Sequence, residues 1–104
     1  MNHLAVSRDI PAGHPAFAGH FPGRPLLPGV LLLAEVMEAA RTAPEPARRL
    51  AGSATLAAAK FLATVPPGAR LDIALQWDDA ALRFEATHEG TVVARGHWSW
   101  KESA

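Results

Sequence analysis

The sequence LDIALQW at residues 71–77 alternates large apolar side chains with smaller or polar ones, and this pattern decides the fold class. The alternation returns in LRFEAT at residues 82–87 and in TVVARGHWSW at residues 91–100. A period of two is typical of strands that bury one face. Residues 78–79 (Asp-Asp) and 89–90 (Glu-Gly) separate the segments and predict hairpin turns. The C-terminal half is therefore predicted to be a meander of three antiparallel strands. The last strand is expected to carry one row on one face: Val92, Ala94, Gly96, Trp98 and Trp100.

A helix is predicted upstream, over VLLLAEVMEAAR at residues 30–41. The segment is rich in good helix formers, and Thr-Ala-Pro at residues 42–44 predicts its end. Glu35 and Glu38 form a narrow polar stripe, so we expect a central, mostly buried helix. The side chains expected to face apolar surroundings are Val30, Leu31, Leu33, Ala34, Met37 and Ala40. Residues 52–63 stay ambiguous, because their alanines favour a helix while Phe61 and Leu62 suit a strand. The predicted class is α+β, an antiparallel sheet that covers one helix.

Length and composition exclude several classes of protein. With 104 residues, the chain is predicted to be one domain over residues 1–104. Ten basic and ten acidic side chains give a formal charge of zero without a basic stripe, so we expect no nucleic-acid partner. There is no cysteine, and no histidine pair has helix spacing for a metal, so we predict no metal site and no cofactor. We also expect neither a secretory signal nor a membrane span, and hence a cytoplasmic location.

A loop motif immediately before the predicted helix points to a function. The sequence FAGHFPGRPLLPGVL at residues 17–31 resembles the signature of the hot-dog-fold 3-hydroxyacyl-acyl-carrier-protein dehydratases. AKFL at residues 59–62 and VPPG at residues 65–68 look like the strand and turn that follow the helix in this family. The resemblance covers roughly half of the chain. It implies a hot-dog fold and the dehydration of a 3-hydroxyacyl thioester to a trans-2-enoyl thioester, in fatty acid or polyene-type synthesis.

Dehydration of such a thioester needs a base for the C2 proton, an acid for the departing hydroxyl and donors for the thioester oxygen. His20 is the candidate base, since a histidine titrates near working pH and this one lies in a proline-rich loop. Its competing interpretation is a turn histidine that bonds a backbone carbonyl. The amides of Gly29 and Val30 lie at the positive end of the helix dipole and suit a thioester oxygen. Phe21 and Ala34 complete the expected substrate-binding residues.

The sequence differs from the family pattern at the position of the catalytic acid. The family places a Glu or Asp fourteen positions after the histidine, and this chain has Ala34 there. Glu35 is adjacent, but one step along a helix turns a side chain by about 100°. Glu38 is about 40° from Ala34 around the helix and roughly 6 Å along it, so it is the candidate catalytic acid. The competing interpretation is that both glutamates form a solvated stripe.

The resemblance also implies partners. The family's sites are built across a dimer, with the histidine from one subunit and the carboxylate from the central helix of the other. We expect an acyl carrier protein as the substrate-bearing partner and a homodimer, or a heterodimer with a related hot-dog subunit that supplies the carboxylate. Two other functions remain open, an acyl thioesterase and a non-catalytic hot-dog subunit. Scattered basic side chains, with Arg24 in the motif loop first among them, are candidates for contact with an acidic carrier.

Overall fold

The computed structural model describes residues 2–13 and 29–100. Most of the motif loop, including His20, Phe21 and Arg24, lies outside the described residues. The elements are, in chain order, β1 (Asn2–Asp9), α1 (Gly29–Ala40), α2 (Pro44–Leu50), β2 (Ala54–Phe61), β3 (Arg70–Trp77), β4 (Ala81–His88) and β5 (Thr91–Trp100).

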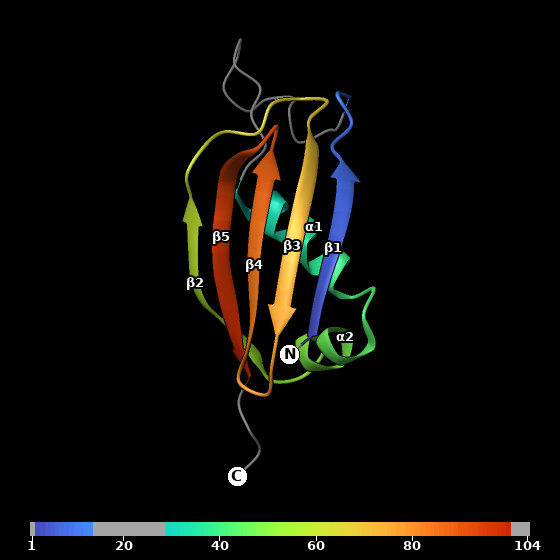
Figure 1. Ribbon diagram of the computed structural model, residues 1–104, viewed down its shortest axis with the longest axis vertical. Coiled ribbons are helices and arrows are strands. Elements are labelled where there is room, and N and C mark those ends of the chain that lie inside the picture. Colours follow the sequence, from blue (N-terminus) through green and yellow to red (C-terminus); the bar gives the residue numbers. More distant parts are fainter. Residues whose placement is uncertain (1, 14–28, 101–104) are drawn as a thin grey trace.

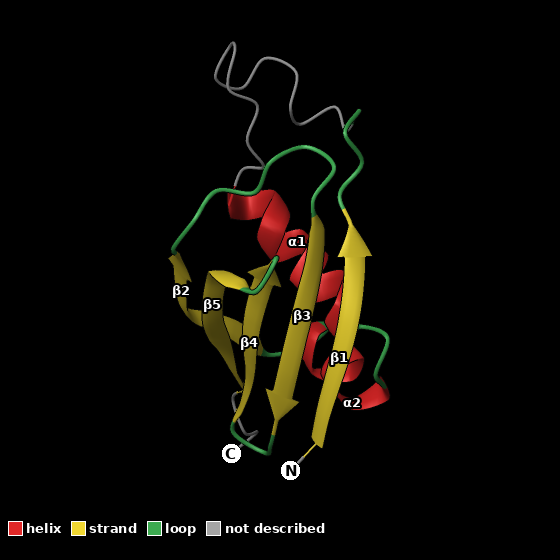
Figure 2. Cartoon of the chain, turned by 45° about the horizontal axis from the view of Figure 1, so that its top comes forward, coloured by secondary structure: helices red, strands yellow, loops and turns green. Residues whose placement is uncertain are grey.

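The described strands form one antiparallel sheet in the order β1-β3-β4-β5-β2. Helix α1 lies along one face of this sheet, and α2 lies at the end where β1 begins (Figure 1, Figure 2). Apolar side chains from both layers form the core, among them Leu32 and Val36 of α1 with Leu71 and Ile73 of β3. This is the antiparallel sheet covering a helix that the sequence pattern predicts, and the hot-dog fold that the family resemblance implies.

The C-terminal meander is confirmed. β3 alternates exposed and buried side chains without interruption, and β3 pairs with β4 from Asp72↔Thr87 to Trp77↔Leu82. Glu89 and Gly90 form the second turn with φ of 51° and 79°, the left-handed region that a tight hairpin requires. The predicted row on β5 is wrong at one position, because the register shifts between Ala86 and Thr87 and leaves Val93 as an extra residue. As a result Val93 and Ala94 are both buried, while Val92 is half-buried.

Two strands were not predicted outright. The ambiguous segment is strand β2, which pairs with β5 at one edge of the sheet. The segment Asn2–Asp9 is strand β1, which pairs with β3 at the other edge. Both are edge strands, so they bury fewer side chains and show weaker alternation than the central strands.

Helix α1 begins one residue earlier than predicted and ends at Ala40. Its fully buried side chains are Leu32, Val36, Ala39 and Ala40. The expectation that Val30 and Ala34 face apolar surroundings is wrong within a single chain, because Val30 is 72% exposed and Ala34 is also exposed. The physical reason is that a helix on an open sheet is covered on one side only. A nearly all-apolar helix therefore leaves apolar side chains on its outer side.

The turn between β3 and β4 depends on one carboxylate. Asp78 Oδ1 accepts hydrogen bonds from the amides of Ala80 (2.8 Å) and Ala81 (2.9 Å). These bonds, first the one from Ala80 and then the one from Ala81, hold the pKa of Asp78 below its ordinary value of 3.8, with a further contribution from Arg83. The carboxylate is therefore more stable in the folded chain than in the unfolded one.

We expect Asp78→Ala to lower the free energy of unfolding at neutral pH. Because the folded pKa is depressed, the contribution of Asp78 is fully present above 3.8 and is lost as the pH falls through the lower folded value. Urea denaturation of both proteins at about pH 7 and about pH 3 measures the difference, which should shrink at the lower pH. Asp79→Ala, at the exposed neighbouring position, is the control and should show a smaller effect at neutral pH. An equal difference at both pH values would contradict this account.

Candidate active site

The start of α1 lies against the end of β2. A Cβ added at Gly29 would come within 2.9 Å of Phe61 Cζ, so the phenyl ring occupies the space that a side chain at Gly29 would need. The first turn of this helix, all of it described, carries no acidic side chain. Its positive end is thus not neutralised from within the turn, which favours a bound anion or a carbonyl oxygen there. Gly29 and Val30 occupy the positions that the sequence predicts for the thioester-binding amides.

An exposed row runs along α1 from this end. Val30, Ala34 and Glu38 are spaced four residues apart and are all exposed, so they share one side of the helix. Glu38 Oε1 accepts a hydrogen bond from Arg41 Nη1 at 3.2 Å, and the Glu38 side chain is 57% exposed. An exposed ion pair of this kind contributes about 0–1 kcal/mol to the free energy of unfolding. The Glu38 carboxylate can therefore leave Arg41 for another hydrogen-bond partner at little cost.

Glu35 lies on another side of α1 and is already engaged. Its Oε2 accepts hydrogen bonds from Arg8 Nε at 3.2 Å and from Arg8 Nη2 at 3.0 Å. The Glu35 side chain is only 23% exposed. This pair joins β1 to α1 and therefore fixes the rotation of the helix about its axis, which sets the direction of the row of Val30, Ala34 and Glu38.

Large apolar side chains are exposed at the start of that row and along β2. Phe61 and Leu62, at the end of β2, are each 49% exposed, and Leu56 of the same strand is exposed as well. With Val30 they form what we call the apolar edge, defined by Val30, Leu56, Phe61 and Leu62. Exposed apolar side chains that form a contiguous patch mark interaction sites on protein surfaces.

The predicted residues fall into three groups. Gly29, Val30, Ala34 and Glu38 are brought together along one end and one side of α1. His20 and Phe21 lie outside the described residues. Trp98 and Trp100, of the row predicted on the last strand, are buried; Trp98 packs beside Phe84 and Trp100 donates a hydrogen bond to the carbonyl of Asp78.

Sequence reasoning missed the role of Arg8 in holding α1. The signal that would have found it is the alternation of Leu4, Val6 and Arg8, which are all half-buried and share the face that carries the helix. The contact of Phe61 with Gly29 was also missed, since it joins positions far apart in the chain.

Within residues 2–13 and 29–100, no group of three or more His, Cys, Asp or Glu side chains is placed to hold a metal ion. No helix in this part of the chain is long and apolar enough to cross a membrane.

Comparison with known proteins identifies the family of this chain. The family model described as ApeI-like, ApeI dehydratase, matches residues 1–97. The 3-hydroxyacyl-acyl-carrier-protein dehydratase FabZ of Herpetosiphon aurantiacus is 32% identical over 98 residues, which cover 86% of this chain and 70% of the relative. The FabZ of Myxococcus xanthus is 30% identical over 109 residues, covering 91% of this chain and 69% of the relative.

Solved structures agree as well. The dehydratase heterocomplex ApeI:P from Xenorhabdus doucetiae is 27% identical to this chain with a TM-score of 0.77, over 96% of this chain and 88% of that one. The fluoroacetyl-CoA thioesterase FlK has a TM-score of 0.66 over 94% of this chain and 82% of that one, but its 13% identity shows a shared fold only. On the family match over nearly the whole length, this chain belongs to the ApeI-like dehydratase family.

Proposed function

We propose that this chain removes water from a 3-hydroxyacyl thioester carried on acyl carrier protein, giving a trans-2-enoyl thioester for fatty acid or polyene-type synthesis. The observation that supports this most is the family match over residues 1–97, combined with a first turn of α1 that is free of acidic side chains. The relatives named above are dehydratases of acyl-carrier-protein substrates. We infer that the reaction takes place in the cytoplasm.

In this proposal His20 takes the proton from C2 of the acyl chain. The electron pair of the broken C2–H bond forms the C2=C3 double bond, the C3–O bond breaks, and the hydroxyl leaves as water after receiving a proton from an acid. Negative charge that builds on the thioester oxygen is stabilised by the amides of Gly29 and Val30. Phe21 and Ala34 contact the acyl chain.

Glu38 is our candidate for the acid in place of the missing carboxylate at Ala34. It shares the exposed side of α1 with Ala34, and only the weak pair with Arg41 holds it. The distance of roughly 6 Å along the axis is within the reach of a glutamate and one bound water. Glu35, held by Arg8 on another side of the helix, is a poor alternative.

A pair of substitutions tests this assignment. We expect Glu38→Gln to lower dehydration by about 10²-fold or more, because the hydroxyl then leaves without a proton donor. Glu35→Gln should keep most of the activity, since its pair with Arg8 serves α1 and not the substrate. The measurement is mass spectrometry of a panel of 3-hydroxyacyl carrier proteins, following the loss of one water. Equal activity of Glu38→Gln and wild type would remove Glu38 from the mechanism.

A partner-completed site is the second candidate, and a specific observation favours it. Ala34 is exposed and brings no carboxylate, and the similar solved ApeI:P structure is a heterocomplex. A related hot-dog subunit would then supply the carboxylate to His20 of this chain. If the purified chain turns over no substrate while a co-expressed pair does, this version holds. Turnover by the chain alone would contradict it.

We propose that the apolar edge is where a second hot-dog subunit binds, either another copy of this chain or a related one. Strand β2 is at the edge of the described sheet, and an edge strand presents backbone groups that another strand can pair with. Light scattering after size-exclusion chromatography determines the mass of the assembly. The acyl thioesterase alternative is not favoured by the comparisons, and release of free acid in the same mass-spectrometric assay would reveal it.

A further inference from the structure

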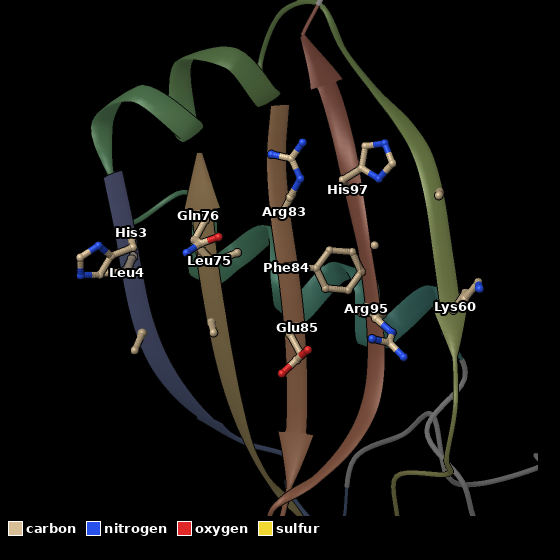
Figure 3. Close-up of a pocket in the computed structure, with 14 residues that line it drawn as sticks. His3, Leu4, Lys60, Leu75, Gln76, Arg83, Phe84, Glu85, Arg95 and His97 are labelled. Carbon is tan, nitrogen blue, oxygen red and sulfur yellow. The ribbon is translucent and has the colours of Figure 1, made fainter. Parts of the chain in front are cut away.

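The sheet face turned away from α1 contains a groove that dehydration does not use. The groove has a volume of about 780 Å³ and crosses all of the described strands (Figure 3). Helix α1 lies on the other face of the sheet (Figure 2), so the thickness of the sheet separates the groove from this helix. We call it the outer groove.

Two rows of side chains line the outer groove, each crossing the sheet in register. In the first row His3 is paired with Gln76, Gln76 with Arg83, and Arg83 with His97. Figure 3 shows these four side chains, labelled on β1, β3, β4 and β5. Arg83 Nη1 is 3.7 Å from Asp78 Oδ2, an exposed pair that neutralises it only in part.

In the second row Ala5 is paired with Ala74, Ala74 with Glu85, Glu85 with Arg95, and Arg95 with Lys60. The short alanine side chains at one end of the row make the face hollow. At the other end Arg95 and Lys60, two cations, face each other across neighbouring strands. In the part of the chain that the structure describes, no ion pair involves Lys60, Glu85 or Arg95.

The charges of the outer groove are only partly compensated, because Arg95 lies between Glu85 on one neighbouring strand and Lys60 on the other. Like charges directly opposite each other on paired strands destabilise a sheet. The chain is neutral overall, yet the outer groove carries Lys60, Arg83 and Arg95 against the single acid Glu85. An acidic partner would relieve the repulsion between Arg95 and Lys60 on binding, so the charges favour a complex over the free chain.

The same charges argue against a second copy of this chain as the occupant. A two-fold axis would place the groove against itself, so that Arg95 and Lys60 of one copy would face a surface of the same sign. The occupant must therefore differ in charge from the groove.

The dimensions of the groove suggest the form of the occupant. Five strands spaced at about 4.8 Å give a width of about 19 Å across the sheet. An α-helix of about 13 residues has this length, and its apolar side can rest on Ala5, Ala58 and Ala74. Carboxylates on its flank then meet Arg83, Arg95 and Lys60.

We propose that the outer groove docks an acidic amphipathic helix of a protein partner, on the face opposite to the dehydration site. This contact brings no group to the substrate. It tethers the chain to a protein that need not carry the acyl group.

The test uses the full chain and a defined probe. The probe is a capped helical peptide of about 14 residues with glutamates along one flank and alanines elsewhere. The control peptide is identical except that glutamine replaces every glutamate. Fluorescence anisotropy measures affinity, and amide NMR shifts locate the site. We expect the acidic peptide to bind at least about 10-fold more tightly than the glutamine peptide and to shift amides of the strands that line the outer groove.

A charge-matched pair of variants completes the experiment. Lys60→Gln with Arg95→Gln should weaken binding by about 10-fold, because both cations leave the groove. Arg48→Gln with Arg70→Gln removes the same charge outside the groove and should change binding less than about 2-fold. Thermal melts of both double variants check folding, and raising the salt should weaken binding to wild type independently of any variant. Equal affinity for the two peptides, an equal loss in both double variants, or shifts confined to α1 and the apolar edge would overturn the proposal.

Discussion

Replacement of His20 by alanine is expected to lower dehydration by about 10²–10⁴-fold, the largest catalytic effect that we predict for this chain. The proton on C2 is weakly acidic, and without the imidazole only water would remain to accept it. The amides of Gly29 and Val30 would still stabilise the thioester oxygen, so binding should change less than turnover. The measurement is single-turnover formation of the enoyl product from a 3-hydroxyacyl carrier protein, using the chain alone or the reconstituted pair, whichever is active.

His88→Ala is the matched control for this experiment. His88 lies at the end of β4, where its Nδ1 is 3.2 Å from the carbonyl oxygen of Arg70. Its loss should leave turnover within about 2-fold of wild type, because this half-buried side chain has no part in the proposed reaction. If His20→Ala kept full activity with unchanged folding, another residue would be the base, and the assignment of His20 from the loop motif would be wrong.

The parts of the fold that the sequence predicted well are those where burial repeats in a simple period. β3 buries Leu71, Ile73, Leu75 and Trp77 and exposes the residues between them, so alternation alone identifies it. The turns at Asp78 and Gly90 were predictable because hydrogen bonds to a side chain and a positive φ need particular residue types.

The two edge strands could not be predicted from the sequence, and the reasons are physical. Residues in β2 are mostly exposed, and its alanines have no strong preference for a strand, so neither pattern nor propensity identifies it. In β1 the alternation includes Arg8, a charged side chain on the inner face that is accepted there only because Glu35 pairs with it. Glu35 belongs to a helix distant in sequence, so the sequence around Arg8 gives no sign of this ion pair.

The candidate site likewise combines features that the local sequence predicts with features that depend on tertiary packing. The loop motif and the helix start are local features, and they are sufficient to place Gly29 and Val30 at the beginning of α1. The ring of Phe61 against Gly29 depends on how β2 lies against α1, which no local pattern contains. The exposure of Val30 and Ala34 was likewise not predictable from an apolar helix, because only packing determines which of its apolar sides is covered.

The second large effect is on stability, and it concerns Gly96. Gly96→Ala is expected to lower the free energy of unfolding by about 3 kcal/mol or more, since an added methyl group would overpack a closed site. A Cβ there would collide with the carbonyl oxygen of Ala58, and it would lie 2.9 Å from the Cα of Ala59 and 2.8 Å from Phe84 Cε2. Two of the three atoms belong to the backbone of β2, which cannot move away as a flexible side chain can. Thermal denaturation should show a fall in Tm of about 12 °C or more.

Gly13→Ala separates this steric effect from the general consequence of replacing a glycine. Among the described residues other than its chain neighbours, none has a heavy atom within 4 Å of a Cβ placed at Gly13, so these residues leave room for alanine. A fit of this kind is neutral or slightly stabilising, because alanine reduces the freedom of the unfolded chain. If Gly96→Ala melts like Gly13→Ala, β2 does not approach β5 as closely as described. If it melts far lower, the contact between the two strands is confirmed, and with it the position of the edge strand that carries Phe61 to the start of α1.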